Sequence, residues 1–207
     1  MILTDAHRSA LNDILTWRRD VRHFCTDHIA PDRLMRLRAA MDLAPSVGNA
    51  RPWRVMQVAT PALRAAVIAN FEAANARAAA RYDDSRRTTY MNLKLAGLRD
   101  APVHLAIFTA KDPDEGHGLG RQTMAEMLTY STACAIHTLW LAARADNIGV
   151  GWVSILDPAA LHATLNAPQD WTLTAYLCLG IAATDDDTPL LHRAGWQQNT
   201  PTGWQVV

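Results

Sequence analysis

The sequence predicts an α+β fold within a single domain, and three observations support this prediction. Several segments place apolar residues at helical spacing, four short apolar segments have the composition of strands, and the two kinds do not alternate regularly as in parallel α/β folds. The 207 residues suit one domain of ordinary size. A content of 49% hydrophobic and 19% charged residues excludes a disordered or low-complexity chain.

The first part of the chain predicts three helices and one strand. Apolar spacing predicts a helix that ends near Trp17 and a second helix over about 31–43. The alternating segment RVMQVAT follows Pro52 and predicts a strand. Thr60 and Pro61 then begin a third helix, because a threonine cap followed by proline is typical of a helix start.

The second part opens with a polar, weakly periodic segment at 81–95, which we interpret as a lid, either a mobile flap or a continued helix. An apolar strand is expected at 103–110 and the longest helix at about 121–146, where small residues in the middle permit close helix packing. GVGWVSIL and TLTAYLCLG predict two more strands with a short helix between them. Residues 181–207 lack periodicity and are expected to extend over a neighbouring molecule.

Charge and cysteine content exclude several functional classes. Lys plus Arg equals Asp plus Glu at 20 each, so no global field attracts nucleic acid or an anionic membrane. Three widely spaced cysteines fit neither a disulfide framework nor a metal site, and they favour a reducing cytoplasm. The first residues carry polar groups where a signal peptide is apolar, and no uncharged apolar stretch is long enough to span a membrane.

Charged residues cluster directly after the first expected helix. Arg18, Arg19 and Arg22 place three guanidinium groups within five residues, which suits bidentate contacts to a phosphate. Asp20 lies among them, and we expect the arginines to hold its carboxyl group ionised. On spacing alone, the favoured explanation of the cluster is a solvated charged turn after the helix.

Two further segments could complete a binding site. The loop at 44–53 contains two prolines, a glycine, a hydroxyl and an amide, so it is either a rigid platform for a planar heterocycle or a structural turn. Gly149 and Gly151 permit close backbone approach. Ser154 adds a hydroxyl at a strand edge, where serine is more often structural than catalytic.

Together, the arginine cluster, the APSxxNxxPW loop and the GVGW turn resemble the nitroreductase superfamily of flavoproteins, in the same order along the chain. One branch, the 5,6-dimethylbenzimidazole synthases, is matched more specifically by RRDVRHF, SVGNARPW, YMNLKLAGLRDAPV, LGRQTM, YSTACAIHTLWLAARADNIGVGWVSIL and AYLCLG. The resemblance implies a nitroreductase-like fold for residues 1–207, with a central mixed, mostly antiparallel sheet flanked by helices. It also implies a domain-swapped homodimer with FMN sites built from both chains.

In that branch reduced FMN is a substrate, and dioxygen drives its fragmentation to 5,6-dimethylbenzimidazole, the lower ligand of cobalamin, and erythrose 4-phosphate. A separate flavin reductase would supply the reduced FMN, and no metal is implied. By position, the resemblance assigns phosphate and ribityl binding to Arg18, Arg19 and Arg22, isoalloxazine contact to Pro45, Ser46 and Asn49, backbone approach to Gly149 and Gly151, and catalysis to Asp20 and Ser154. In the tail, His192 and Arg193 are the only candidates for binding the phosphate.

The sequence also departs from the family's pattern. The atypical residues are Asn49, Arg51, Ala96, Leu128, His137 and Thr138. Arg51 adds a charge beside the expected flavin, where the wider superfamily commonly has glutamine. The alternatives that remain are an NAD(P)H-dependent FMN nitroreductase or flavin reductase, a corrinoid reductase, and a non-enzymatic FMN-binding protein.

Overall fold

The computed structural model describes residues 1–93 and 97–207, in which the core is an antiparallel sheet of four strands in the order β1-β2-β4-β3. The strands are β1 (Trp53–Gln57), β2 (Val103–Ala110), β3 (Gly149–Val153) and β4 (Trp171–Gly180). Each lies where the sequence predicts one. An isolated parallel bridge between Asp20 and Val150 makes the pairing mixed but mostly antiparallel, as expected.

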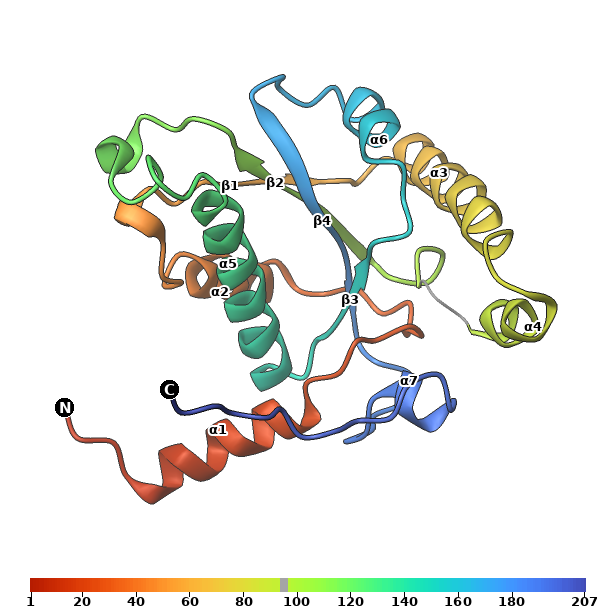
Figure 1. The fold of residues 1–207 in the computed structure, drawn as a ribbon, viewed down its shortest axis with the longest axis horizontal. Helices are drawn as coiled ribbons and strands as arrows, with labels where there is room; N and C mark the ends of the chain where they lie inside the picture. Colours follow the sequence, from red (N-terminus) through yellow and green to blue (C-terminus); the bar gives the residue numbers. More distant parts are fainter. Residues whose placement is uncertain (94–96) are drawn as a thin grey trace.

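Helices cover both faces of the sheet (Figure 1), which confirms the α+β class. One face carries α2 (Pro31–Met41) and α5 (Met127–Ala145), and the other carries α3 (Pro61–Ala79) and α6 (Pro158–Thr164). The remaining elements are α1 (Asp5–Trp17), α4 (Asp84–Asn92), α7 (Leu190–Arg193) and the short 3-10 helices η1 (Val47–Asn49) and η2 (Glu115–Gly118).

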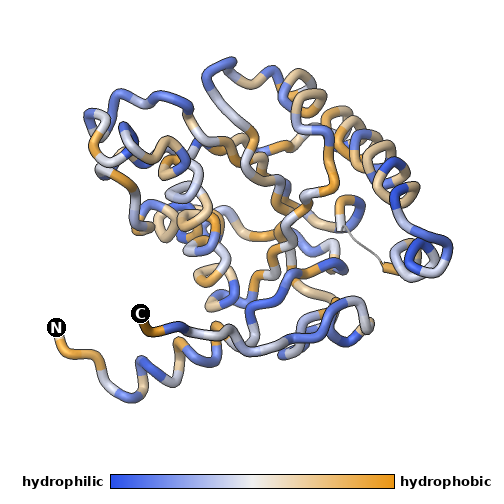
Figure 2. The backbone as a smooth tube through the Cα atoms, viewed as in Figure 1, coloured by the Kyte–Doolittle hydropathy of each residue, from blue (hydrophilic) through white to orange (hydrophobic). Residues whose placement is uncertain are grey.

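Alternating side chains of the strands build two apolar cores. On the α2 and α5 side, Ile107 and Leu177 are fully buried with Ile136. On the other side, Phe108 and Tyr176 are fully buried against α3 and α6. Burying each such side chain contributes about 1.5–3 kcal/mol, so the two layers fix the sheet between the helices. In Figure 2 the strands at the centre are largely apolar, whereas α4 at the edge is mostly hydrophilic.

One expected boundary was wrong, and one of the two interpretations of the 81–95 segment is excluded for residues 81–92. The helix expected at about 121–146 begins at Met127, so its 19 residues equal α3 in length and do not exceed it. It does not begin near residue 121 because Arg121 is held in the preceding loop by the Pro113 carbonyl oxygen at 2.9 Å and by Asp112 at 2.8 Å. Residues 81–92 are not a continuation of α3. A separate helix begins after Asp83, whose carboxylate accepts a hydrogen bond from the Arg86 amide at 2.8 Å.

The expected lid and tail are only partly covered by these elements. The end of the 81–95 segment and Ala96 lie outside the described residues. In the 181–207 tail, the sequence predicts no regular structure, but α7 forms there as one short helical turn. Beyond α7 the tail has no helix or strand among the described residues.

Candidate functional site

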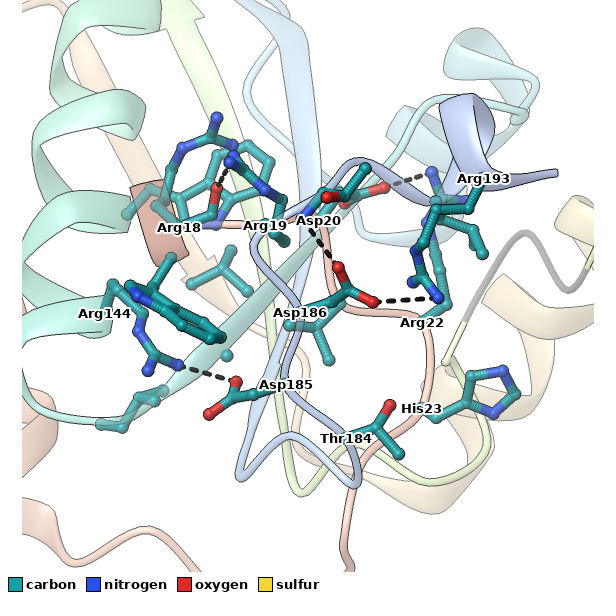
Figure 3. Close-up of a pocket in the computed structure, with 18 residues that line it drawn as sticks. Arg18, Arg19, Asp20, Arg22, His23, Arg144, Thr184, Asp185, Asp186 and Arg193 are labelled. Carbon is teal, nitrogen blue, oxygen red and sulfur yellow. Dashed lines mark hydrogen bonds and ion pairs between the residues drawn. The ribbon is translucent and has the colours of Figure 1, made fainter. Parts of the chain in front are cut away.

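A cavity of about 260 Å³ lies where the end of α1, the carboxyl end of α5, the start of β3 and the tail meet (Figure 3). Among the described residues, five arginines and three aspartates line it: Arg18, Arg19, Arg22, Arg144 and Arg193, with Asp20, Asp185 and Asp186. With all of them ionised, the arginines exceed the aspartates by two positive charges. The cavity is therefore suited to an anion with two negative charges, such as a phosphate monoester.

The segment that carries the arginine cluster reaches the cavity by pairing with the edge of the sheet. Val21 donates its amide hydrogen to the Val150 carbonyl oxygen at 3.0 Å. A Cβ atom on Gly149 would lie 2.8 Å from the Val21 side chain, and one on Gly151 would collide with the Val21 carbonyl oxygen. The two glycines thus make room for this segment. Their expected approach to a flavin stays a prediction.

Asp20 is held in one orientation by two contacts. Its Oδ1 accepts a hydrogen bond from the Trp152 amide at 2.8 Å, and its Oδ2 forms an ion pair with Arg22. Burial raises the pKa of the Asp20 carboxyl above its ordinary value, and the Arg22 charge and the Trp152 amide offset only part of that rise. Desolvation thus opposes the arginines, which the sequence interpretation did not consider, and the expectation that they hold this group ionised stays a prediction.

Arg18 and Arg19 have different surroundings. The Arg18 guanidinium lies 5.0 Å from the centre of the Trp140 ring in a cation–π contact. Burial and the charge of Arg19 lower the pKa of Arg18, and Asp20 opposes this shift. Arg19 donates from Nε and Nη2 to the Asp187 carbonyl oxygen at 2.9 and 2.5 Å. Both side chains are thus oriented at the cavity before any ligand binds.

The sequence interpretation missed the acidic part of the cavity and Arg144. Arg144 pairs with Asp185 at 2.8 Å, and Arg193 pairs with Asp186 at 3.0 Å (Figure 3). The run of three aspartates at 185–187, shortly after the last strand ends at Gly180, was a visible signal. Its meaning was hidden, because only the fold brings that turn opposite the arginines that follow α1.

The loop that contains Pro45, Ser46 and Asn49 lies at the other end of α5. The Val47 amide donates to the Ser131 hydroxyl at 3.0 Å, whereas the arginine cavity is lined by Arg144. These two α5 residues are separated by about 20 Å at a rise of 1.5 Å per residue. The structure therefore does not bring this loop to the arginine cavity of the same chain.

Within the loop, the Ser46 hydroxyl accepts a hydrogen bond from the Arg51 amide at 2.8 Å. The guanidinium of Arg51 turns back and donates to the Asp42 carbonyl oxygen at 3.0 Å. Asn49 and Arg51 both have positive φ angles, of 56° and 47°. The loop is therefore a defined turn, with its serine and its arginine engaged in hydrogen bonds within or beside it.

Some of the predicted site residues line the arginine cavity and others do not. Five of them line the cavity: Arg18, Arg19, Asp20, Arg22 and Gly149. Gly151 and Ser154 do not line the described part of the cavity, and Ser154 is exposed just after the end of β3. Within the described residues, no group of three histidine, cysteine or acidic side chains is placed to hold a metal ion. No helix there is long and apolar enough to cross a membrane.

Comparison with known proteins shows the family to which the chain belongs. Residues 15–181 match the model of the Nitroreductase family, and the chain belongs to that family. A solved structure of iodotyrosine deiodinase, bound to FMN and 3-iodo-L-tyrosine, superimposes with a TM-score of 0.72 at 19% identity and covers 95% of this chain and 97% of its own. A nitroreductase-like protein from Bacillus cereus superimposes with a TM-score of 0.66 at 14% identity, covering 95% of both chains. The nitroreductase-like fold is thus confirmed.

Within the family, the most informative relatives are curated proteins named 5,6-dimethylbenzimidazole synthase. One from Rhodobacter capsulatus is 58% identical over 99% of both chains. A second from Rhodobacter capsulatus is 54% identical, again over 99% of both chains. One from Rhodospirillum rubrum is 49% identical over 94% of this chain and 92% of its own length. The resemblance to this branch that the motifs predict is confirmed.

Proposed function

We propose that this chain is a 5,6-dimethylbenzimidazole synthase, which uses dioxygen to convert reduced FMN to 5,6-dimethylbenzimidazole, with erythrose 4-phosphate as a second product. The observation that carries the proposal is the 58% identity, over 99% of both chains, to a curated protein of that name. The free cysteines Cys25, Cys134 and Cys178 support a cytoplasmic location. A separate flavin reductase supplies the reduced flavin.

The arginine cavity suits the phosphate end of FMN. Its surplus of positive charge matches a phosphate monoester, and Arg18, Arg19 and Arg22 would hold the phosphate and the ribityl chain. At about 260 Å³ the cavity is smaller than the roughly 300–1,000 Å³ of pockets that enclose whole ligands. The isoalloxazine ring must therefore lie outside it, beside a second surface.

A second copy of the chain would supply that surface. The loop with Pro45, Ser46 and Asn49 lies beside the end of α5 that is far from the cavity of its own chain. A two-fold dimer can bring this loop to the cavity of the other copy. In this arrangement the backbone of Gly149 and Gly151 approaches the isoalloxazine ring. The whole chain then acts as one flavin-binding domain, and the 181–207 tail reaches the partner subunit in a domain-swapped homodimer.

The exposed surface supports this homodimer. The solvent-accessible area of 12,595 Å² exceeds the roughly 9,600 Å² expected for a compact monomer of 22.8 kDa. On α5, Tyr130, Cys134 and His137 form an outward stripe at helical spacing, and Tyr130 is 52% exposed. A central helix with such a face is expected to pack against another chain.

Bound reduced FMN supplies the reducing ring system that reacts with dioxygen. Asp20 acts as a proton carrier at its carboxyl group, because a raised pKa brings an acid closer to the working pH. Arg22 and the Trp152 amide fix the orientation of that group. Ser154 orients the reacting part of the substrate through its hydroxyl, and the 81–95 segment excludes water as a lid.

The test is to mix the purified protein with chemically reduced FMN in air-saturated buffer without NAD(P)H. Flavin and 5,6-dimethylbenzimidazole are followed by chromatography and mass spectrometry, with the same mixture lacking protein as control. We expect protein-dependent loss of flavin with a matching amount of benzimidazole. Intact, reoxidised FMN without that product would instead indicate a flavin reductase, a corrinoid reductase or a binding protein.

A further inference from the structure

Three aromatic rings join the C-terminal segment to α4. The Trp196 ring lies 5.5 Å from the Tyr82 ring in an edge-on contact and 6.4 Å from the Tyr90 ring, and the two tyrosine rings are 5.2 Å apart. Tyr90 also donates its hydroxyl hydrogen to the Asn75 side chain at 2.5 Å, which fastens it to α3. Trp196 thus packs on the part of α4 that is attached to the body of the protein.

The attachment of α4 is otherwise weak. Tyr90 is 5% exposed and is the one buried side chain of α4 among those that the structure describes. A helix of nine residues does not form stably in water by itself, so its position depends on these contacts. Removing one of the rings is therefore expected to release α4 more often.

Trp196 is fixed to α7 by the backbone. The Trp196 amide donates to the Leu191 carbonyl oxygen at 2.9 Å, and the Gly195 amide donates to the His192 carbonyl oxygen at 3.0 Å. This pair of bonds, with Gly195 at a φ of +70°, is a Schellman motif that closes the end of α7. The indole is held in register with the helix that precedes it.

The same helix reaches the arginine cavity at its other side. Leu190 and Arg193 line the cavity, and the guanidinium of Arg193 pairs with Asp186. Because Arg193 is three residues before Trp196, one short rigid unit contacts both the cavity and α4. Figure 1 shows α7 next to α4 on the side toward α1.

From this connection we propose that Trp196 is a positioning residue that couples occupancy of the arginine cavity to the position of α4. A phosphate group in the cavity draws the charge of Arg193 toward it and fixes α7, and Trp196 then fixes Tyr82 and Tyr90. The inference rests on the proposed function, in which the phosphate belongs to FMN and α4 is part of the lid. Because coupling between sites is reciprocal, a fixed α4 in turn strengthens phosphate binding.

Limited trypsin digestion measures the position of α4 directly, since Arg86 and Arg87 lie within it. Wild-type protein is digested alone, with FMN, with inorganic phosphate and with riboflavin, which lacks the phosphate. We expect FMN and phosphate to slow cleavage at these arginines about tenfold and riboflavin to slow it little. In Trp196→Ala, cleavage should be fast under all four conditions, and Trp196→Phe should restore part of the protection.

Two further variants separate coupling from general damage. Trp204→Ala is the matched control, because Trp204 is in the same tail and 92% exposed, and it should behave as wild type. Gly195→Ala acts only through the backbone, since its φ is +70° while nothing lies within 4 Å of an added Cβ, and it should reduce the protection by FMN.

FMN binding itself is measured by quenching of flavin fluorescence. Equal protection by FMN in wild type and in both Trp196→Ala and Gly195→Ala would overturn the coupling while leaving the proposed function intact. If wild-type protein binds FMN but shows no phosphate-dependent protection, the coupling is also wrong. A wild-type protein that does not bind FMN would instead contradict the proposed function.

Discussion

Asp20 joins a raised pKa to a fixed orientation, which is the combination that proton transfer requires. In Asp20→Asn the side chain keeps its size and can still accept the hydrogen bond from Trp152, but it cannot exchange a proton at working pH. We expect formation of 5,6-dimethylbenzimidazole to fall by at least about 100-fold, the lower end of the usual contribution of acid–base catalysis. Mass spectrometry of the product and fluorescence titration with FMN separate catalysis from binding.

Ser154→Ala is the companion change, because it removes only a hydroxyl from an exposed position at the end of β3. It too should strongly reduce formation of the product while FMN still binds. Unchanged turnover in either variant would contradict the role proposed for that residue.

In the acidic turn of the tail, a substitution is expected to strengthen FMN binding. Asp185 neutralises Arg144 at 2.8 Å, so the substitution Asp185→Asn leaves that guanidinium available to a phosphate. Because the Asp185 side chain is 53% exposed, the gain is small, and we expect FMN to bind up to about fivefold more tightly. Fluorescence titration at two salt concentrations checks this. Glu72→Gln, which removes an ion pair with Arg99 elsewhere on the surface, should leave FMN affinity unchanged.

At the scale of single elements, β2 and β4 enclose a buried polar pair. His104 of β2 is fully buried, and its Nδ1 lies 2.9 Å from the Tyr176 hydroxyl of β4. Burial, with a smaller contribution from Arg64, lowers the pKa of His104 to about 4. The unfolded chain binds a proton there near pH 6.5, so the unfolded state gains protons first as the pH falls.

The contribution of neutral His104 to the free energy of unfolding should therefore be fully present above about pH 6.5. It should decline by about 3 kcal/mol as the pH falls toward 4. Urea unfolding at pH 7, 5.5 and 4.5 measures this slope. In His104→Gln no proton is taken up, so the part of the slope due to this site should disappear, although the variant is less stable throughout. His28→Gln, at an exposed position, should keep the wild-type slope.

The elements also show what local sequence can and cannot predict. The bounds of β2 followed from its largely apolar run between Pro102 and polar residues. The start of α5 did not, because Arg121 contacts carbonyl and carboxylate groups of the preceding loop. The sequence did not predict α7, because a helix of four residues has too little periodicity to detect and is stabilised by tertiary contacts.

At the scale of the whole molecule, the candidate site is divided between the two ends of α5. The motifs predicted both halves, and the family resemblance assigned both to one flavin. Neither predicted how they are separated in one chain, since the distance depends on how Ser131 and Arg144 are placed along the same helix. The place of the acidic turn opposite the arginines could not be predicted for a similar reason. Residues 184–188 reach the cavity only because β4 pairs with β3.

This division makes the dimer testable through one residue. Cys134 is exposed in the middle of the outward stripe of α5, and Cys134→Asp would place an unpaired charge there. We expect light scattering after size-exclusion chromatography to give twice 22.8 kDa for wild type and 22.8 kDa for the variant. Because the ring would then lack the loop from the other copy, FMN affinity should fall in parallel.

The matched control is Ala69→Asp, which adds the same charge at an exposed position of α3 on the opposite face of the sheet. It should remain dimeric and bind FMN normally. A monomeric wild-type protein that binds FMN would show that one chain completes the site by itself. In that case, the loop of Pro45 and Ser46 would have to reach the flavin through a rearrangement of its own chain.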